Sequence, residues 1–160
     1  MLAAWEARGL LKTVITQNVD NLHFEAGSRN VIEFHGNSRT LVCLGCFARV
    51  PATQEILATL PPKCSCGGML KPDMVFFGEG IRRAASEGAD KAADLTDCML
   101  VVGSTGEVYP AALVPRRAKE HGATIIEVNP MPSEFTGDAD VRIPLGAAEA
   151  LDLLEKELCG

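Results

Sequence analysis

Four of the six cysteines lie in two close pairs, Cys43 with Cys46 and Cys64 with Cys66. Four thiolates at this spacing can surround one tetrahedral Zn²⁺ at about 2.3 Å each. The alternative is four buried cysteines without a metal, which the single residue between Cys64 and Cys66 favours, because two intervening residues are commoner in zinc sites. Four sulfur ligands leave no open coordination position, so the pattern predicts a structural and not a catalytic zinc.

A histidine at the end of an apolar run is a second candidate. His35 directly precedes Gly36, which places its imidazole at the carboxyl end of an expected strand. Open α/β sheets bind their ligands at such ends. A histidine that only makes a structural hydrogen bond is the alternative at this position. His121, just before Gly122, has a simpler interpretation as the cap of a helix.

Two polar segments also follow expected strands. Gln17, Asn18, Asp20 and Asn21 form the first, and they can either bind a ligand or simply form a turn, because Asn and Asp are common turn residues. The second, Gly-Ser-Thr-Gly at 103–106, can present backbone N–H groups and hydroxyls to a phosphate or ribose. It matches neither the G-x-G-x-x-G fingerprint nor the P-loop.

Alternating strands and helices are expected to position these residues. Apolar runs predict strands at 12–16, 31–34, 74–77, 98–102, 124–128 and 141–143. Helices are expected at 22–26, 82–94, 110–121 and 147–158, with a bend at Pro115. This alternation predicts a doubly wound, Rossmann-like parallel sheet, formed by 1–37 and 72–160. The cysteines and several Pro and Gly turns predict a small inserted zinc-ribbon module at 38–71.

Composition narrows the class of protein. The chain has 160 residues, of which 47% are hydrophobic and 22% charged, as in a soluble domain with a core. A net charge of −6 argues against nucleic acid and anionic membranes as partners. No apolar run approaches the ~20 residues that cross a bilayer, and the start does not resemble a signal peptide. We therefore expect a cytoplasmic protein whose cysteines are thiols or metal ligands.

Several ordered segments resemble the sirtuin family of NAD-dependent protein deacylases. They are TQNVDNLH (16–23), EFHGN (33–37), the four cysteines, KPDMVFFGE (71–79), VVGSTGEVYPAA (101–112) and EVNP (127–130). The resemblance extends from about Leu10 to the last helix. It implies an enzyme that removes an acyl group from a protein lysine, consumes NAD, and releases nicotinamide and O-acyl-ADP-ribose.

The resemblance also implies roles for individual residues. His35 matches the general base that acts on a ribose hydroxyl of NAD. The residues implied at the nicotinamide and ribose pocket are Gln17, Asn18, Val19 and Asp20. Those implied at the adenosine half are Gly103, Ser104, Thr105, Asn129, Pro130, Met131 and Ala147. Those implied to bracket an acyl-lysine peptide, bound as an added strand, are Val75, Phe76, Phe77, Gly78, Glu107 and Val108.

Two departures from the family pattern leave other functions open. The usual Gly-Thr-Ser is here Gly103-Ser104-Thr105. The family's first strand and its Gly-rich loop, which wraps the NAD pyrophosphate, would lie before Met1. The alternatives are a non-catalytic protein that binds NAD or ADP-ribose, and a structural zinc-ribbon interaction module. The net charge of −6 argues against a nucleic-acid-binding form of that module.

The 160-residue chain by itself is expected to bind NAD weakly and to show little or no deacylase activity. Dinucleotide folds hold the pyrophosphate with the N–H groups of a Gly-rich turn, and the turn at 103–106 is assigned to the adenosine side. An uncovered sheet edge is also expected to promote self-association. Calorimetric titration with NAD measures the affinity, and an acetyl-lysine peptide assay measures the deacylase activity. Micromolar binding with NAD-dependent turnover would contradict the prediction.

Overall fold

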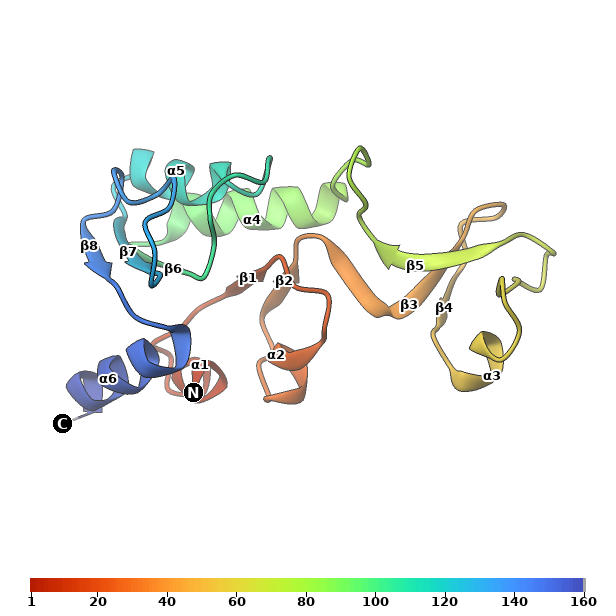
Figure 1. Cartoon of the computed structure of the whole chain (residues 1–160), viewed down its shortest axis with the longest axis horizontal. Coiled ribbons are helices and arrows are strands. Elements are labelled where there is room, and N and C mark those ends of the chain that lie inside the picture. Colours follow the sequence, from red (N-terminus) through yellow and green to blue (C-terminus); the bar gives the residue numbers. More distant parts are fainter. Residues whose placement is uncertain (160) are drawn as a thin grey trace. The chain divides into compact units, whose positions relative to one another are not determined.

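Short strands that alternate with helices make up most of the chain, of which the computed structural model describes residues 1–159 (Figure 1). Two compact units divide it: one comprises Leu2–Ser86, and the other comprises Glu87 onward together with Met1. Helix α4 (Arg83–Leu95) carries the chain from the first unit into the second. None of the helices in the described part is long and apolar enough to cross a membrane.

The first unit begins with a small parallel sheet. Its elements are α1 (Leu2–Ala7), β1 (Val14–Thr16), α2 (Leu22–Glu25) and β2 (Val31–Glu33). β1 and β2 pair in parallel, with Val14 opposite Val31. Both strands consist largely of β-branched residues, which suit a pleated and half-buried surface. The strands predicted at 12–16 and 31–34 are therefore confirmed, with shorter bounds.

An antiparallel module completes the first unit. Its elements are β3 (Gly36–Cys43), β4 (Arg49–Pro51), α3 (Gln54–Leu57) and β5 (Leu70–Met74). The strand order is β4-β3-β5, and both pairings are antiparallel. The buried core of this module is small and consists of Leu41, Cys43 and Leu70. The module runs from Gly36 to Met74 and therefore includes the residues 38–71, for which an insertion was predicted.

Strand β5 corrects one prediction. A strand was expected at 74–77, but β5 ends at Met74. The chain then turns, because the Glu79 N–H donates to the Phe76 carbonyl at 2.9 Å and the Glu79 carboxylate accepts the Phe76 N–H at 3.1 Å. The apolar pattern of 74–77 could not reveal this turn, since the residue that closes it lies beyond the apolar run.

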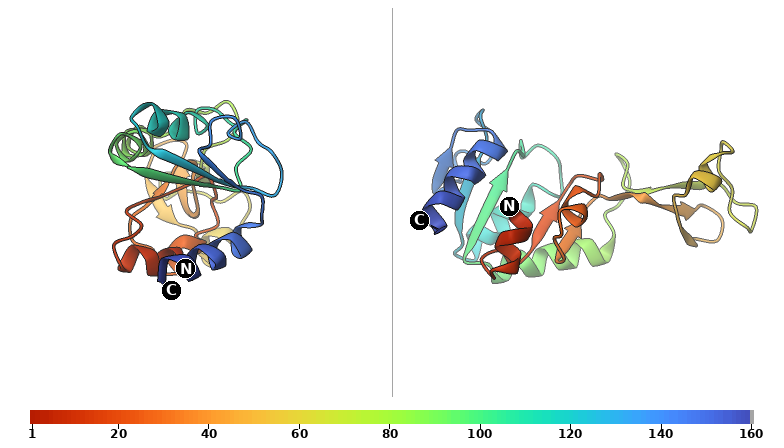
Figure 2. Two further views of the ribbon diagram at one scale, coloured as in Figure 1. Left: turned by 90° about the vertical axis from the view of Figure 1, so that its left-hand side faces the viewer. Right: turned by 90° about the horizontal axis from the view of Figure 1, so that it is seen from below.

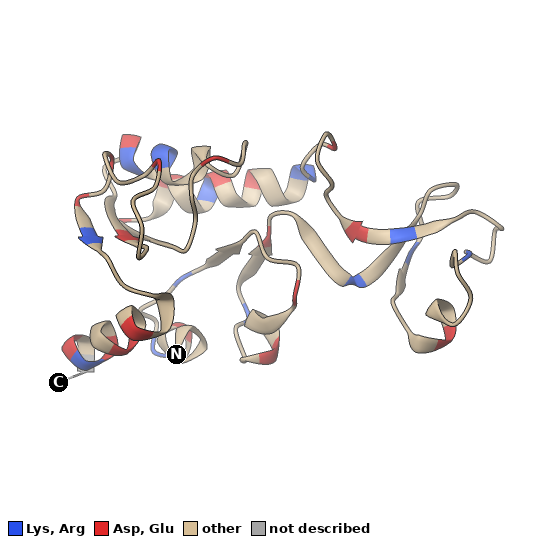
Figure 3. Cartoon of the chain, in the orientation of Figure 1, with Lys and Arg blue, Asp and Glu red and all other residues tan. Residues whose placement is uncertain are grey.

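The second unit contains a parallel sheet of three strands. Its elements are β6 (Cys98–Val102), α5 (Leu113–Glu120), β7 (Thr124–Val128), β8 (Val141–Ile143) and α6 (Ala147–Cys159). The order is β6-β7-β8, and all pairings are parallel. All three strands have the predicted bounds. α4 lies beside α5 (Figures 1 and 2), where Arg117 donates to Asp94 at 2.8 Å. Figure 3 marks positions of acidic and basic residues along both helices.

Helix α5 begins later than predicted. The sequence predicted that the helix starts at residue 110, whereas it begins at Leu113. Pro115 therefore lies in the first turn, where backbone N–H groups have no intrahelical acceptor, and its missing N–H breaks no hydrogen bond of the helix. The cap predicted at His121 is confirmed: this residue is the C-cap, and its Nδ1 lies 2.9 Å from the Arg117 carbonyl oxygen.

Parallel strands joined by helices, together with the antiparallel module, confirm the predicted α/β fold. The described strands form two parallel sheets, β1-β2 and β6-β7-β8. Among the described strands, β1 pairs only with β2 and β6 only with β7. This arrangement agrees with the partial Rossmann-like sheet expected from the sequence.

Replacing Gly36 with Ala is expected to destabilise the protein by more than about 1 kcal/mol. Gly36 has a φ of +78°, and an added Cβ would lie 2.1 Å from the Asp73 carbonyl oxygen. Gly9→Ala is the matched control, because Gly9 has a φ of +76° and its nearest neighbour is Lys12 Nζ at 4.0 Å. Urea denaturation measures both variants. Equal losses in the two variants would show that the clash at Gly36 contributes nothing.

Candidate functional site

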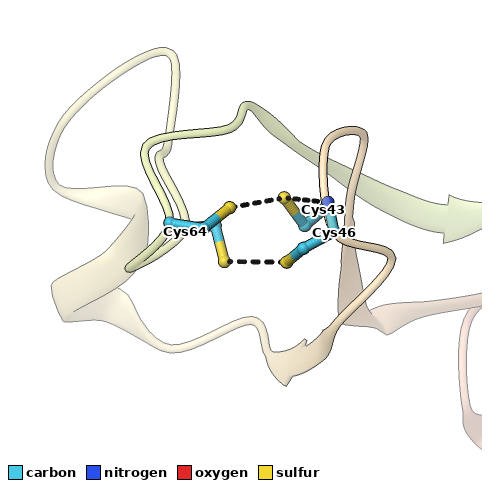
Figure 4. A group of neighbouring side chains, drawn as sticks. Cys43, Cys46 and Cys64 are labelled. Carbon is cyan, nitrogen blue, oxygen red and sulfur yellow. Dashed lines mark hydrogen bonds between the residues drawn. The ribbon is translucent and has the colours of Figure 1, made fainter.

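The four paired cysteines converge on one point (Figure 4). Their sulfur atoms all lie within 4.8 Å of one another. The Cys43 and Cys66 sulfurs are 3.5 Å apart, and those of Cys46 and Cys64 are 3.8 Å apart. A zinc tetrahedron with Zn–S bonds of about 2.3 Å requires sulfurs roughly 3.8 Å apart. All four are free thiols, so the donor set fits one structural Zn²⁺.

The backbone around the cluster favours ionised sulfur. The N–H groups of Cys46 and Gly45 point at the Cys43 sulfur and lower the pKa of Cys43 to about 6. The N–H of Cys66 likewise lowers the pKa of Cys64. At Cys46 one backbone N–H acts in the same direction, but hydrogen bonds with the neighbouring sulfurs, together with burial, raise the pKa of Cys46 to about 12. A divalent cation suits such a cluster, and its binding releases the remaining protons.

His35 lies between β2 and β3, directly after the parallel sheet. Its ring is half-buried and meets the Phe34 ring edge to face, with centroids 5.4 Å apart. Its Nδ1 lies 3.4 Å from the Gln17 carbonyl oxygen. A proton on Nδ1 that is donated to this carbonyl leaves Nε2 as the acceptor, which is the form that a general base requires.

The loop after β1 is fixed beside His35. Both the hydroxyl and the N–H of Ser38 donate to the Val19 carbonyl, at 2.8 and 3.1 Å. The Asn18 N–H donates to Thr16 Oγ1 at 3.1 Å, and the Asp20 carboxylate accepts the Leu22 N–H at 3.1 Å. The structure thus places the segment 17–20 beside His35 at the end of one sheet. The Asp20 contact also gives this residue the turn-forming role weighed above.

The residues implied at the adenosine half lie in the second unit. Two loops meet at the carboxyl ends of β6 and β7: the Asn129 side chain donates to the Ser104 carbonyl at 3.1 Å, and the Glu134 N–H donates to the Thr105 carbonyl at 2.9 Å. Gly103 begins the first of these loops. Pro130 and Met131 are exposed in the second, and Ala147 is exposed at the start of α6. An open cavity of about 330 Å³ is lined by Thr105, Glu107, Pro132, Ser133 and Glu134.

The residues implied to bracket a peptide form no strand of their own. The Val75 N–H donates to the His35 carbonyl at 2.9 Å, so the segment starts beside the backbone of His35. Phe77 is 96% exposed, Phe76 is also exposed, and Gly78 adopts a φ of +87°. Glu107 and Val108 are exposed after β6, in the second unit.

An ion pair that supports this turn was missed from the sequence. Lys71 Nζ lies 2.6 Å from both carboxylate oxygens of Glu79 and 4.8 Å from the centre of the Phe76 ring. This hydrogen bond from Lys71 holds the pKa of Glu79 below its ordinary value. Both residues belong to the KPDMVFFGE segment (71–79), and their eight-residue separation gave no sign that they pair.

Comparisons with known proteins agree with the geometry. Residues 1–110 match the profile of the Sir2 family. An NAD-dependent protein deacylase from Aeropyrum pernix is 44% identical over 159 residues, which are 99% of this chain and 64% of the relative. An NAD-dependent protein deacetylase from Caldivirga maquilingensis is 46% identical over 164 residues, again covering 99% of this chain and 63% of the relative. The chain thus spans just under two thirds of the length of these relatives.

Solved structures are similar over nearly the whole chain. A complex of Sir2 with a p53 peptide and NAD⁺ has a TM-score of 0.92 and 33% identity, and covers 98% of this chain and 67% of the solved chain. A mutant Sir2 homologue in complex with ADP ribose has a TM-score of 0.91 and 38% identity, and covers 98% and 63%.

Purified protein is expected to contain one zinc per chain, bound by the four clustered cysteines. Changing Cys46 to Ser should abolish zinc binding and unfold the region from about 38 to 71, because the remaining thiolates no longer share a bound metal. The parallel sheets should remain largely folded. Mass spectrometry measures the zinc content, and circular dichroism measures the loss of structure.

Cys98→Ser is the matched control, since Cys98 is an exposed cysteine outside the cluster. This variant should retain one zinc per chain. A metal-free protein whose module stays folded would be evidence against the assignment.

Proposed function

Because the chain belongs to the Sir2 family, we propose that it acts as an NAD-dependent protein lysine deacylase, which consumes NAD and releases nicotinamide and O-acyl-ADP-ribose. Relatives named as such enzymes are 42–46% identical over nearly all of this chain. One observation carries the proposal: His35 Nδ1 faces the Gln17 carbonyl at 3.4 Å, at the end of a parallel sheet. This contact orients an imidazole toward the loop to which the NAD ribose is assigned.

His35 is the proposed general base. NAD, when bound, supplies an anomeric carbon from which the acyl oxygen of an acyl-lysine can displace nicotinamide. His35 then accepts a proton from a ribose hydroxyl at Nε2, while Nδ1 stays bonded to the Gln17 carbonyl. Gln17, Asn18, Val19 and Asp20 are proposed to surround the nicotinamide and its ribose.

The remaining contacts are divided between two further groups. Gly103, Ser104, Thr105, Asn129, Pro130, Met131 and Ala147 are proposed for the adenosine half. Val75, Phe76, Phe77, Gly78, Glu107 and Val108 are proposed for an acyl-lysine peptide. A solved Sir2 structure with 32% identity is described as bound to an acetylated peptide, which supports this class of partner.

The module and the open strand edges complete the proposal. The four-cysteine zinc site holds its own module and takes no part in a chemical step, since it has no open position. We also propose a cytoplasmic location, where reduced thiols persist. Self-association is proposed through β1 or β6, because each pairs along one edge only among the described strands.

His35→Ala should lower the deacylation rate by roughly 10²- to 10⁴-fold while ADP-ribose affinity changes little, since only the base is removed. The test uses the chain extended at Met1 by the corresponding leading segment of the Aeropyrum relative. Nicotinamide release with an acetyl-lysine peptide measures the rate, and calorimetry measures the affinity.

His121→Ala is the control, because this histidine caps α5 and should leave the rate unchanged. A His35→Ala variant with the parental rate would refute the role of His35. If the parental extended chain binds ADP-ribose without turnover, the function is binding and not catalysis.

A further inference from the structure

A fully buried carboxylate lies on the middle strand of the second unit. Glu127 of β7 is 0% exposed, and its neighbours on the strand include the buried Ile125 and Val128. Its nearest cationic group is Arg142 Nε on β8, 3.6 Å from Glu127 Oε2. A buried carboxylate is costly unless its oxygens are hydrogen-bonded. The hydroxyls of Ser133 and Thr136 meet that requirement.

Both oxygens of Glu127 bind the loop that follows β7. The Ser133 hydroxyl donates to Oε1, and the Thr136 hydroxyl donates to Oε2 at 2.8 Å. The same hydroxyls accept hydrogen bonds from the loop backbone: Ser133 Oγ from the Phe135 N–H at 3.0 Å, and Thr136 Oγ1 from the Ser133 N–H at 2.8 Å. Each hydroxyl therefore connects the carboxylate to the backbone of the loop. The Phe135 ring of this loop is 1% exposed and lies against Gly106, where a Cβ would be 3.0 Å from its Cε2.

The anchored loop is also joined to the turn at 103–106. The Glu134 N–H donates to the Thr105 carbonyl, and the Asn129 side chain donates to the Ser104 carbonyl. Gly106 makes this approach possible, because a Cβ there would lie 2.8 Å from Glu134 Cβ. The two joined loops form the walls of the cavity of about 330 Å³. Movement of the loop would therefore change the distance between these walls.

We propose that Glu127 is a positioning residue, which holds the loop 129–136 against the turn 103–106 in the conformation that receives the adenosine half of NAD. This inference rests on the proposed function. Glu127 itself is buried beneath the loop and acts through Ser133 and Thr136. A purely structural carboxylate, by contrast, would stabilise β7 and its neighbours without a specific effect on the loop.

Glu127→Gln is the test, because the amide keeps the size of the side chain but retains only one acceptor oxygen. Hydrogen exchange of the Ser133, Glu134 and Phe135 amides should become at least about ten-fold faster, while exchange of the β7 amides stays unchanged. The dissociation constant for ADP-ribose, measured by calorimetry on the chain extended at Met1 as in the His35 test, should rise about ten-fold.

Two hydroxyl variants keep the inference testable if Glu127→Gln fails to fold. Ser133→Ala and Thr136→Val each remove one donor to Glu127, and each should speed loop exchange and weaken ADP-ribose binding. In the Glu127→Gln background their effects should be smaller than in the parental chain, because the three residues act as one unit.

Asp140→Asn is the matched control. The Asp140 carboxylate accepts the Ile125 N–H of β7 at 2.8 Å and the Lys119 ammonium at 2.9 Å, without a contact to Ser133 or Thr136. This variant should lower stability while loop exchange and ADP-ribose affinity stay at parental values.

Three results would overturn the inference: unchanged loop exchange, equally faster exchange in the loop and in β7, or faster loop exchange with unchanged ADP-ribose affinity. A parental extended chain that binds no ADP-ribose would instead contradict the proposed function. Loop exchange in Glu127→Gln would still decide whether Glu127 holds the loop.

Discussion

The close approach of Gly36 to Asp73 is the constraint on which the first unit depends. No side chain fits at position 36, where a Cβ would lie 2.1 Å from the Asp73 carbonyl oxygen. This contact places His35 where the chain passes from the parallel sheet into the antiparallel module. The Asp73 carboxylate in turn binds Arg49 at 2.9 Å and Arg82 at 3.2 Å. One crossing point therefore fixes the imidazole, the base of the module and the segment before α4.

In each unit, the geometry of parallel strands brings two chain segments together. Parallel strands end at the same edge of a sheet, so the loops that follow them are neighbours. In the first unit this brings the loop after β1 to His35, and in the second it brings the loop after β7 to the turn after β6. Side-chain hydrogen bonds then fix the loops: Ser38 holds the first, and Glu127 holds the second. The chemistry assigned to the loops differs, but their support has the same origin.

The range of an interaction explains how much the sequence could predict. β6, β7 and β8 were predicted at their observed bounds because a short stretch rich in apolar and β-branched residues is a local signal. The cysteine cluster was visible for the same reason, since each pair is close in sequence. The prediction of a strand at 74–77 was wrong because Glu79, which lies beyond the apolar run, closes a turn there. No role was predicted for Glu127, whose partners reach it only in the folded chain. The roles of the individual site residues stay predictions, because resemblance supplied them.

The antiparallel module has a small core, which makes it depend on the zinc site, and one of its strands leads to the proposed peptide turn. Three buried side chains form that core, one of them the cysteine Cys43, which is too little apolar surface for an independent fold. A metal held by four thiolates supplies the missing stabilisation. β5 runs from the cluster to Met74, where it pairs with Gly36, and the next residue bonds to the His35 carbonyl. One strand thus connects the metal cluster to the turn and to His35, so a zinc site without an open coordination position still supports the segment proposed to bind the peptide.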